Sequence, residues 1–504
     1  MLKTDALVLL VNSLSKTEKK TFRKNRKMSA YIALFDIIEK EKDISSQDLK
    51  SKFEAQQKKA NFNVAVSYLY KLLLNCLLSL RENQDNHYFL FLNILKAKIL
   101  FEKALYEEAF DMLKSIKEEA ARLENYYALL YASRLELEYL LFINLPNISE
   151  VELLNKHFKI NEVLKNIRKI NEQLSLYELL KHRIIYKGNI RSEVQKNTLA
   201  DLVISEMSII ASSNIDNFET KKLHQLFQSN YLIHIGDDKS AIHSYYELNQ
   251  LFESNKHLWA NPPFYYLYAL EGILDNLRSI RSYDKTRYFI EQLKNIGYYS
   301  SQFQVNVKTL IFLYELFPLL DRGDFKLSEQ LLNQNYESVI AKTDELSLVR
   351  QAEVALYVAL IYIGLRNFKS ARKTLKNIII RGKNFYDFPL YRTIRLVNLI
   401  IQYEIGNEDV IRFESRSIKR ELTKTEKAYQ VERLMLHFLN SPIKGMIKAQ
   451  RAKMWKKIEP ELQTIRNNIY EKQILKYFDF TAWMESELCK IPLQEVLGSR
   501  FLQS

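Results

Sequence analysis

The residue types that most often carry chemistry are scattered in this sequence. The nearest grouping places His234 and His243 nine residues apart, across a predicted turn, with Asp237 and Asp238 between them. A zinc site needs three or four ligands brought together, and on a helix two histidines serve when they are three or four residues apart. No pair of the eight histidines has that spacing. We therefore predict no metal centre.

Residues for covalent or phosphate chemistry are equally sparse. The two cysteines, Cys76 and Cys489, cannot build a disulfide framework or a cysteine-rich metal site, which indicates a reducing compartment. Cys76 lies in an apolar stretch typical of a helix core, and the acidic pair Glu107–Glu108 belongs to a charged helix face. The ten glycines never cluster into a phosphate-binding loop. The sequence therefore predicts a protein without catalysis and without a cofactor.

Positive charge is the one chemical feature that is concentrated in the chain. The formal net charge is +14, of which residues 1–60 contribute +6 and residues 416–457 contribute +9, leaving −1 for the remainder. Local excesses of this kind are typical of contacts with phosphate groups or an acidic protein surface, and also of a solvated helix face. The candidate contact residues are Lys19, Lys20, Arg23, Lys24, Arg26 and Lys27 in the first region and Lys444, Lys448, Arg451, Lys453, Lys456 and Lys457 in the second.

The composition indicates which elements must position these residues. Only ten glycines and eight prolines occur among 504 residues, whereas strand-rich folds need many turn-forming residues. Helices are therefore expected throughout the chain. Its length predicts either several domains or one extended repeat array.

The apolar stretches are too short for a membrane protein. The first apolar run covers about eight residues before Asn12 and Ser13 interrupt it, which is short for a signal peptide. No uninterrupted apolar run approaches the roughly 20 residues that span a bilayer. We expect a soluble, cytoplasmic protein without membrane insertion.

A recurrent pair of residues shows how the helices are organised. In "NFKSARKTL" the aromatic Phe368 precedes the small Ala371 by three positions, and Tyr106 precedes Ala109 in the same way. From Ala241 to Ala371 the successive small residues are 45, 42 and 43 positions apart. Ala109 lies 132 positions before Ala241, which is three steps of 44. A fixed period of this size predicts stacked helix pairs.

Each helix pair needs small residues where its two helices cross. A small side chain one turn into the second helix lets the helices approach, and the aromatic residue before it fills the wedge at the turn. Glycine tolerates a left-handed backbone and is expected to end first helices at Gly236, Gly323 and Gly364. The predicted packing positions are Ala97, Tyr106, Ala109, Ser229, Ala241, Thr286, Phe325, Ser328, Ala359, Phe368 and Ala371.

This pattern resembles the tetratricopeptide repeat family. The stretches "GDFKLSEQLL" and "IYIGLRNFKSARKTLKNII" are similar to its turn and second helix, and "KAKILFEKALYEEAFDMLKSI" is similar across both helices. The period departs from the family, at about 43 residues rather than 34. The closing proline is missing, and Leu274 and Leu316 replace a small residue of the first helix. The resemblance implies an α-solenoid of antiparallel helix pairs over residues 88–415, with units also near 130–175 and 175–215, and hardly specifies a ligand.

Residues 1–80 are expected to form a separate module. They show the order helix, turn, short helix, loop and long apolar helix, which is shared with helix-turn-helix modules. The long helix, "VAVSYLYKLLLNCLLSL", has almost no charge to offer a nucleic-acid groove, so a packing role is favoured. Capping boxes mark predicted helix starts here and near the C-terminus: Ser15 with Glu18, Ser45 with Asp48, and Thr423 with Glu426.

Residues 416–504 combine the second basic stretch with a final helix that is rich in aromatic residues. That helix carries Tyr477, Phe478, Phe480 and Trp483. The ends of repeat arrays need an element with one apolar and one polar face. We predict that this segment caps the array.

Two functions from different classes fit these features. The first is a non-catalytic scaffold, in which the first helices of the pairs line a concave surface that holds a protein or peptide partner. The alternative is a nucleic-acid-associated regulator, in which the N-terminal module or residues 444–457 contact the phosphates of DNA or RNA. The sequence favours the scaffold and leaves the partner and the oligomeric state open.

Overall fold

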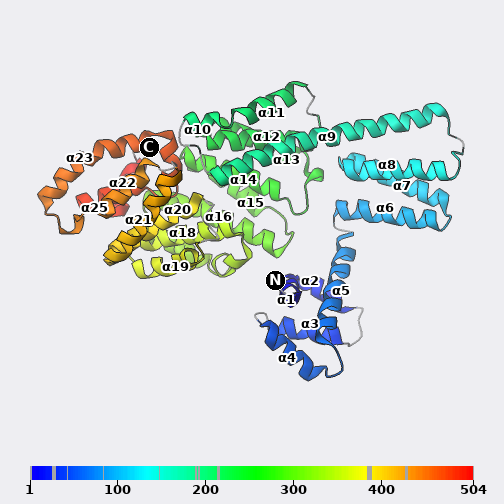
Figure 1. The fold of residues 1–504 in the computed structure, drawn as a ribbon, viewed down its shortest axis with the longest axis horizontal. Helices are drawn as coiled ribbons and strands as arrows, with labels where there is room; N and C mark the ends of the chain where they lie inside the picture. The colour runs from blue at the N-terminus through cyan, green and yellow to red at the C-terminus, as the bar shows by residue number, and fades with distance from the viewer. Residues whose placement is uncertain are drawn as a thin grey trace. The chain divides into compact units, whose positions relative to one another are not determined.

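The regular structure of this protein is helical. The computed structural model describes residues 3–24, 30–41, 44–82, 85–146, 148–187, 190, 193–212, 216–382, 389–425 and 429–502. Within these ranges every regular element is a helix and no strand occurs (Figure 1). The predicted all-helical class is therefore confirmed. The chain divides into two compact units, Met1–Arg168 and Lys169–Ser504.

The first unit begins with a small helical module around one apolar core. Its helices are α1 (Lys3–Ser13), α2 (Lys16–Lys24), α3 (Ala30–Lys40), α4 (Ser46–Gln56) and α5 (Phe62–Glu82). Leu7, Phe22, Phe35, Phe53 and Leu69, one from each helix, are each at most 1% exposed in this core. Aromatic and aliphatic side chains from all five helices thus pack into one core.

Side-chain caps begin two of these helices. Ser15 Oγ accepts a hydrogen bond from the Glu18 backbone N–H at 3.2 Å, and Glu18 Oε2 accepts one from the Ser15 N–H at 2.7 Å. The predicted capping box is thereby confirmed. Ser45 Oγ likewise accepts from the Asp48 N–H at 3.1 Å. The third predicted box depends on Glu426, which lies outside the described residues.

Helix α5 packs on one side only. Val66, Leu69 and Leu73 are at most 2% exposed against the module core, whereas Val64 and Tyr68 on other faces are 65% and 49% exposed. The predicted packing role therefore holds for one face of the helix. By length and composition α5 and α16 (Ser301–Arg322) are the described helices that would be able to cross a membrane, and 61% of the apolar window of α16 is buried within the fold.

Three antiparallel helices follow α5 in the first unit. They are α6 (Asn86–Glu102), α7 (Tyr106–Arg122) and α8 (Tyr126–Phe142), and each contacts both of the others. Ala97 and Ala109 are fully buried where α6 and α7 pack together. The Tyr106 ring lies 4.9 Å from the Phe101 ring between centroids, beside a turn in which Ala104 has a φ of 60°.

The next element, α9 (Glu150–Lys187), is one uninterrupted helix of 38 residues. A junction between two repeat units was expected near residue 175, and this point lies inside the helix. The reason is local: Glu150–Lys187 contains neither glycine nor proline to end a helix.

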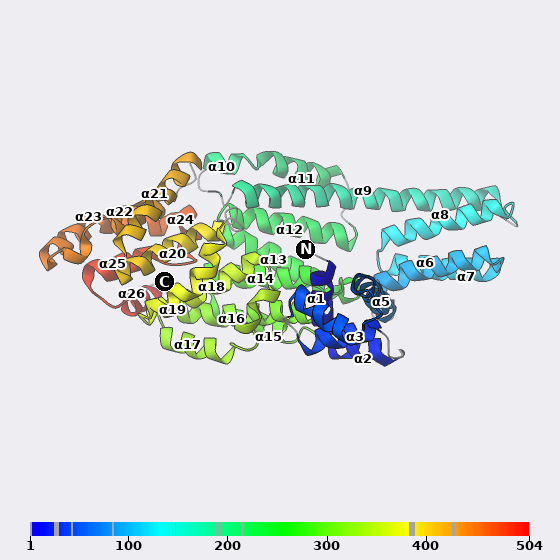
Figure 2. The ribbon, with the colours of Figure 1, turned by 60° about the horizontal axis from the view of Figure 1, so that its bottom comes forward.

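The second unit continues as a succession of helices that pack side by side (Figure 2). From α12 to α21 each helix contacts the next one, and α14, α16, α18 and α20 also contact one another in that order. The helices are α10 (Glu193–Asn197), α11 (Ala200–Ser212), α12 (Phe218–His234), α13 (Asp238–Ser254), α14 (Phe264–Ser279), α15 (Tyr283–Lys294), α16, α17 (Phe325–Gln334), α18 (Leu348–Gly364), α19 (Phe368–Ile380), α20 (Pro389–Ile405) and α21 (Glu408–Thr425).

The small residues identified in the sequence lie at the buried faces of these helices. Ser229, Ala241, Ser328, Ala359 and Ala371 are fully buried, and Thr286 is 5% exposed. Their size lets neighbouring helices approach closely. The substitutes Leu274 and Leu316 are also fully buried, so the longer side chains are accommodated inside the packing.

The glycines at the turns serve two different purposes. Gly236 and Gly323 have φ values of 82° and 80°, as predicted for left-handed helix ends. The same prediction is wrong for Gly364, which is the last residue of α18, while Arg366 takes the left-handed position with a φ of 57°. A Cβ atom on Gly364 would collide with the Phe325 ring. Gly364 is therefore required by the close approach of an aromatic side chain.

The C-terminal helices extend beyond the last helix pair. They are α22 (Gln430–Leu439), α23 (Lys448–Asn467), α24 (Ile469–Leu475), α25 (Phe480–Cys489) and α26 (Leu493–Leu502). Phe480 is fully buried and Trp483 is 3% exposed. Besides packing beside α20 through α22, this segment reaches α16 through α26. Gln473 also donates to the His234 carbonyl at 3.4 Å, so residues 469–502 contact both α12 and α16.

Candidate functional site

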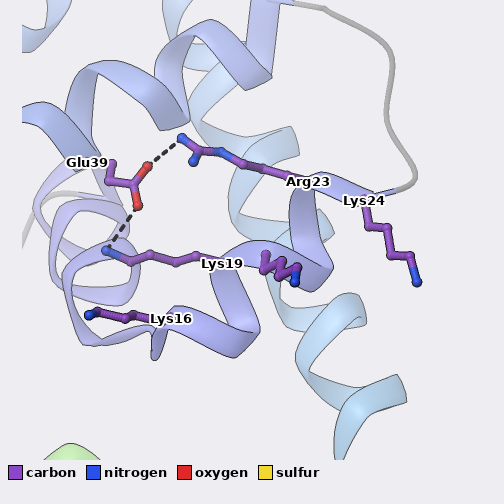
Figure 3. Close-up of a pocket in the computed structure, with 6 residues that line it drawn as sticks. Lys16, Lys19, Arg23, Lys24 and Glu39 are labelled. Atoms are coloured by element: carbon purple, nitrogen blue, oxygen red, sulfur yellow. Dashed lines mark hydrogen bonds and ion pairs between the residues drawn. The ribbon is translucent and has the colours of Figure 1, made fainter.

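The basic residues of the N-terminal module surround a shallow hollow of about 450 Å³ (Figure 3). Helix α2 presents them outward because its apolar residue Phe22 is 1% exposed and packs 4.9 Å from the Phe35 ring. The hollow is lined by Lys16, Lys19, Lys20, Arg23 and Lys24 of α2 and by Glu39 of α3.

Two of these cations already have partners within the module. Lys19 Nζ lies 3.5 Å from Glu39 Oε1, and Arg23 Nη2 lies 2.5 Å from Asp36 Oδ1 and also contacts Glu39. The hydrogen bond to Asp36, followed by the charges of Glu39 and Asp36, raises the pKa of Arg23. Lys19 and Arg23 therefore help to hold α2 on α3 and are less available to an external anion.

The remaining lysines of α2 are open to a ligand. Lys16, Lys20 and Lys24 are exposed and make no ion pair with any described residue. They are four residues apart, so they form one stripe with a rise of about 6 Å along the helix between successive lysines. Lys16 was not among the predicted contacts, although its spacing from Lys20 was visible in the sequence. Arg26 and Lys27, which were predicted, lie outside the described residues.

In the second basic stretch too, some cations bind other groups of the protein and the others are exposed. Lys444 donates to the carbonyl oxygens of Tyr403 and Glu404, and its Nζ lies 4.5 Å from the centre of the Tyr403 ring. Arg451 donates to the Met446 carbonyl at 2.6 Å. These two predicted contacts therefore stabilise the local fold.

The other four predicted cations of this stretch are exposed on α23. The buried residues of α23 are Ile458, Leu462 and Ile465, all in its C-terminal half. Its N-terminal half is therefore free to present charge over a broad arc. Lys448, Lys453, Lys456 and Lys457 are exposed there and make no ion pair with described residues.

A partly buried lysine joins three helices inside the second unit. Lys181 of α9 donates to Asn230 Oδ1 at 2.5 Å and to the Tyr268 hydroxyl, and its Nζ lies 4.6 Å from the centre of the Tyr268 ring. Burial lowers the pKa of Lys181. Both acceptors come from the protein itself, so this amine is satisfied by the packing of α9, α12 and α14.

A second internal ion cluster connects α14 with α18. Arg350 contacts Glu271 and Glu353, each at 2.5 Å. Burial raises the pKa of Glu353 and the charge of Arg350 opposes that rise. Burial in turn disfavours the charged guanidinium, but Glu271 and Glu353 raise the pKa of Arg350. The cluster is a structural clamp between two helices that are not consecutive in the chain.

Arg278 makes further polar contacts between helices of the second unit. Its guanidinium lies 3.7 Å from the centre of the Phe317 ring and donates to the Tyr357 hydroxyl at 3.0 Å and to the Lys476 carbonyl at 2.7 Å. Lys476 in turn contacts Asp275 at 2.6 Å. Polar side chains of α14 therefore contact α18 and residues 469–502.

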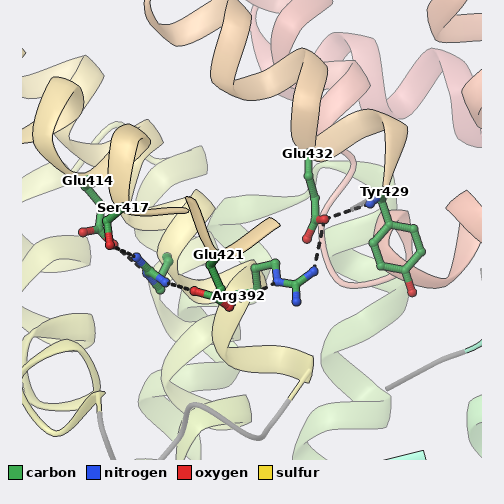
Figure 4. A network of polar contacts seen from close by, with 7 residues as sticks. Arg392, Glu414, Ser417, Glu421, Tyr429 and Glu432 are labelled. Atoms are coloured by element: carbon green, nitrogen blue, oxygen red, sulfur yellow. Dashed lines mark hydrogen bonds and ion pairs between the residues drawn. The ribbon is translucent and has the colours of Figure 1, made fainter. Parts of the chain in front are cut away.

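Two arginines of α20 bind the acidic residues of the neighbouring helices (Figure 4). Arg395 contacts Glu414 and Glu421, each at 2.6 Å, and Arg392 lies 3.4 Å from Glu432. Two carboxylates of α21 are thus directed toward α20. The other two acidic residues of α21, Glu408 and Asp409 in its first turn, are exposed.

The histidines show no metal-binding arrangement in the part of the chain that the structure describes. His234 Nδ1 lies 2.6 Å from the Asn230 carbonyl, which fixes its ring, and burial lowers the pKa of His234 to about 4. His243 is exposed. Among the described residues no three histidine, cysteine or acidic side chains gather as a possible metal site.

Sequence reasoning missed a row of exposed apolar side chains on α6. Tyr88, Phe91, Leu95 and Ile99 are 38%, 41%, 52% and 55% exposed, and their spacing places them on one face. Helix α8 adds Tyr127, which is 59% exposed. The signal was present as apolar residues at helical spacing on a second side of "HYFLFLNILKAKIL", but such a pattern alone does not tell a buried face from an exposed one.

Comparison with known proteins identified no relative. No protein-family model, no curated protein and no solved structure matches the chain.

Proposed function

We propose that the protein is a non-catalytic scaffold whose helix pairs repeat with a period of about 43 residues, in the manner of tetratricopeptide repeats. The support is the burial of small residues at recurrent positions, such as Ala241, Ser328 and Ala371. A further support is that α14, α16, α18 and α20 contact one another in succession, as the first helices of a stacked array do.

The surface proposed to bind a partner is the exposed apolar face of α6. The observation that carries this proposal is the row Tyr88, Phe91, Leu95 and Ile99 on one helix face. Exposed apolar patches of this kind mark protein interaction sites. The spacing of three and four residues matches the way one helix packs against another. The expected occupant is therefore the apolar face of a helix from a partner protein.

The test compares two double variants in a native-lysate pull-down with nuclease treatment. L95E/I99E places two carboxylates in the proposed interface, whereas K114E/S115E places two on the exposed side of α7. A stoichiometric protein should be captured by the natural protein and by the α7 variant and lost from L95E/I99E. Equal capture by both variants, or no captured protein at all, would refute the proposed surface.

Nucleic-acid binding by the open lysines of α2 and α23 is the second candidate function. It is favoured by the unpaired stripe Lys16, Lys20 and Lys24 beside the hollow. Affinity for an oligonucleotide should then fall steeply with salt. Charge reversal of these three lysines should weaken binding, while reversal of Lys19, which pairs with Glu39, should have less effect. An unchanged salt-dependent affinity in the triple variant rules out this site.

A further inference from the structure

The exposed face of α19 carries the most one-sided charge pattern among the second helices of the described pairs. Lys369, Arg372, Lys373 and Lys376 are all exposed, and none makes an ion pair with a described residue. Helix α19 contains no acidic residue. The four cations recur at three- and four-residue spacing, so they form one stripe about 10 Å long.

The inward packing of α19 fixes the direction of this stripe. Ala371, Leu375 and Ile378 are at most 6% exposed and form the buried side of the helix. The four cations occupy the opposite side and cannot be drawn into the core without unpacking it. Other second helices differ: α7 exposes Glu107 and Glu108, so outward charge is not uniform along the protein.

The next second helix, α21, has cations at two of the four corresponding positions. Ser415 is 6% exposed and lies 44 residues after Ala371, so Arg416 and Arg420 correspond to Arg372 and Lys376. Both arginines are exposed without an ion pair to a described residue. Helix α20 packs against both α19 and α21.

Helix α21 adds an exposed aromatic ring to these cations. Phe413 is 72% exposed and precedes Arg416 by three residues, on the same side of the helix. The inward direction of Glu414 and Glu421, which Arg395 binds, keeps two carboxylates away from that side. An apolar ring without a packing partner beside unpaired arginines is costly to leave in water and useful for stacking.

We propose that the outer faces of α19 and α21 form a binding site for single-stranded nucleic acid. The cations contact the phosphates, and Phe413 stacks on a base. Proteins that bind single strands without sequence preference combine a positive track with aromatic stacking platforms, and both components are present here. An acidic polypeptide would use the charges and leave the ring without a role. The site uses none of the residues of the apolar face of α6 and none of the lysines of α2 and α23.

The first experiment measures fluorescence anisotropy of a labelled 20-nucleotide poly(dT) strand with the full-length protein. The test variant neutralises Lys369, Arg372, Lys373 and Lys376 to Gln. The matched control neutralises Lys285, Arg287, Lys326 and Lys342 to Gln, which lie outside the site and remove the same net charge. The test variant should lose at least tenfold in affinity near 100 mM salt, and the control should change less than threefold. Circular dichroism should show equal helicity for both.

Two further readouts separate this site from general electrostatic attraction. The dependence of log K on log salt should become shallower by about 2 to 3 in the α19 variant, since each single-strand phosphate contact contributes about 0.7. Phe413→Ala should weaken binding about tenfold without changing the salt slope. Equal affinities of test variant and control, or equal competition by poly-glutamate of the same total charge, would overturn the proposal; the latter would assign the site to acidic polypeptides.

Discussion

Helices α7 and α19 have similar packing residues on their buried faces and different charges on their exposed faces. Each begins with an aromatic residue three positions before a fully buried alanine, Tyr106 with Ala109 and Phe368 with Ala371. Outward, α7 exposes a run that begins with Glu107 and Glu108, whereas every charged residue of α19 is basic. Packing therefore determines which residues face inward and leaves the exposed positions free to acquire a function.

This comparison also shows why architecture was easier to predict than function. A small residue at a helix crossing is required by contact distances of a few ångströms, and few residue types satisfy it. An exposed position accepts nearly any polar residue at little cost in stability. Charge on an exposed face therefore indicates a function only when its pattern differs from that of equivalent helices, as it does on α19.

The largest effect should come from breaking the inward contact between Phe325 and Gly364. Phe325 is 5% exposed, and its truncation to Ala should lower the free energy of unfolding by about 3–5 kcal/mol. Gly364→Ala should also destabilise the natural protein because the new Cβ atom collides with the Phe325 ring. In the F325A background the same change should cost much less. Urea denaturation of the four proteins measures this coupling, and additive losses would contradict the contact.

The next-largest effect should be on the pH dependence of the free energy of unfolding, through His234. Burial lowers the pKa of His234 to about 4, so between pH 4 and 6.5 the unfolded chain binds more protons at this site than the folded one. Stability from His234 is therefore complete above about pH 6.5 and falls toward pH 4, by up to roughly 3 kcal/mol.

Unfolding of the natural protein, H234Q and H243Q between pH 7 and pH 4 tests this dependence. H234Q should lose less stability than the natural protein over this range, because it has no imidazole to protonate. H243Q should follow the natural protein, since His243 is exposed. Identical pH profiles for all three proteins would show that His234 is not shielded from water.

Enlarging Ala109 or Ala371 should lower the stability of the protein moderately and to the same extent. Ala109→Leu and Ala371→Leu should each destabilise by about 1–3 kcal/mol, because neither crossing has room for three more carbon atoms. Thermal unfolding followed by circular dichroism measures both. A clear loss at Ala371 with none at Ala109 would mean that the two helix pairs are not built alike.

The smallest effect should follow from exchanging outward charge. Replacing Glu107 and Glu108 by Lys, which gives α7 some of the charge of α19, should change the free energy of unfolding by no more than about 0.5 kcal/mol. The same limit applies to Lys369→Gln and Lys376→Gln. A larger change in either helix would show that its exposed charges take part in stability, and the separation of inner and outer faces would need revision.

The sequence predicted the parts of the fold that depend on near neighbours. The reciprocal bonds of Ser15 and Glu18, the left-handed Gly236 and Gly323 and the all-helical class follow from local spacing. Gly364 was expected to end a helix in a left-handed conformation, but it is needed to leave room for the Phe325 ring. The local pattern could not show this, because Phe325 lies 39 residues earlier in the chain. A local pattern holds no information about which distant side chain fills a space.

The same limitation applies to the candidate site. The sequence grouped Lys19, Arg23, Lys444 and Arg451 with their neighbours as candidate contacts, and only the structure shows their engagement with Glu39, Asp36, Tyr403 and Met446. The four cations of α19 do not stand out in a charge sum over the whole remainder of the chain, because acidic residues elsewhere in that remainder offset them to −1. Summing charge over one helix face would have revealed them.

The contact between Arg278 and Lys476 has a consequence for how the protein is made. The two residues are 198 positions apart, and Gln473 reaches the His234 carbonyl across 239 positions. Stacked helix pairs can form one after another as they leave the ribosome, but these bonds cannot form until residues 469–502 have been synthesised. Until then the Arg278 guanidinium lacks its carbonyl acceptor, so we expect the nascent chain to remain open to chaperones longest along α12, α14 and α16.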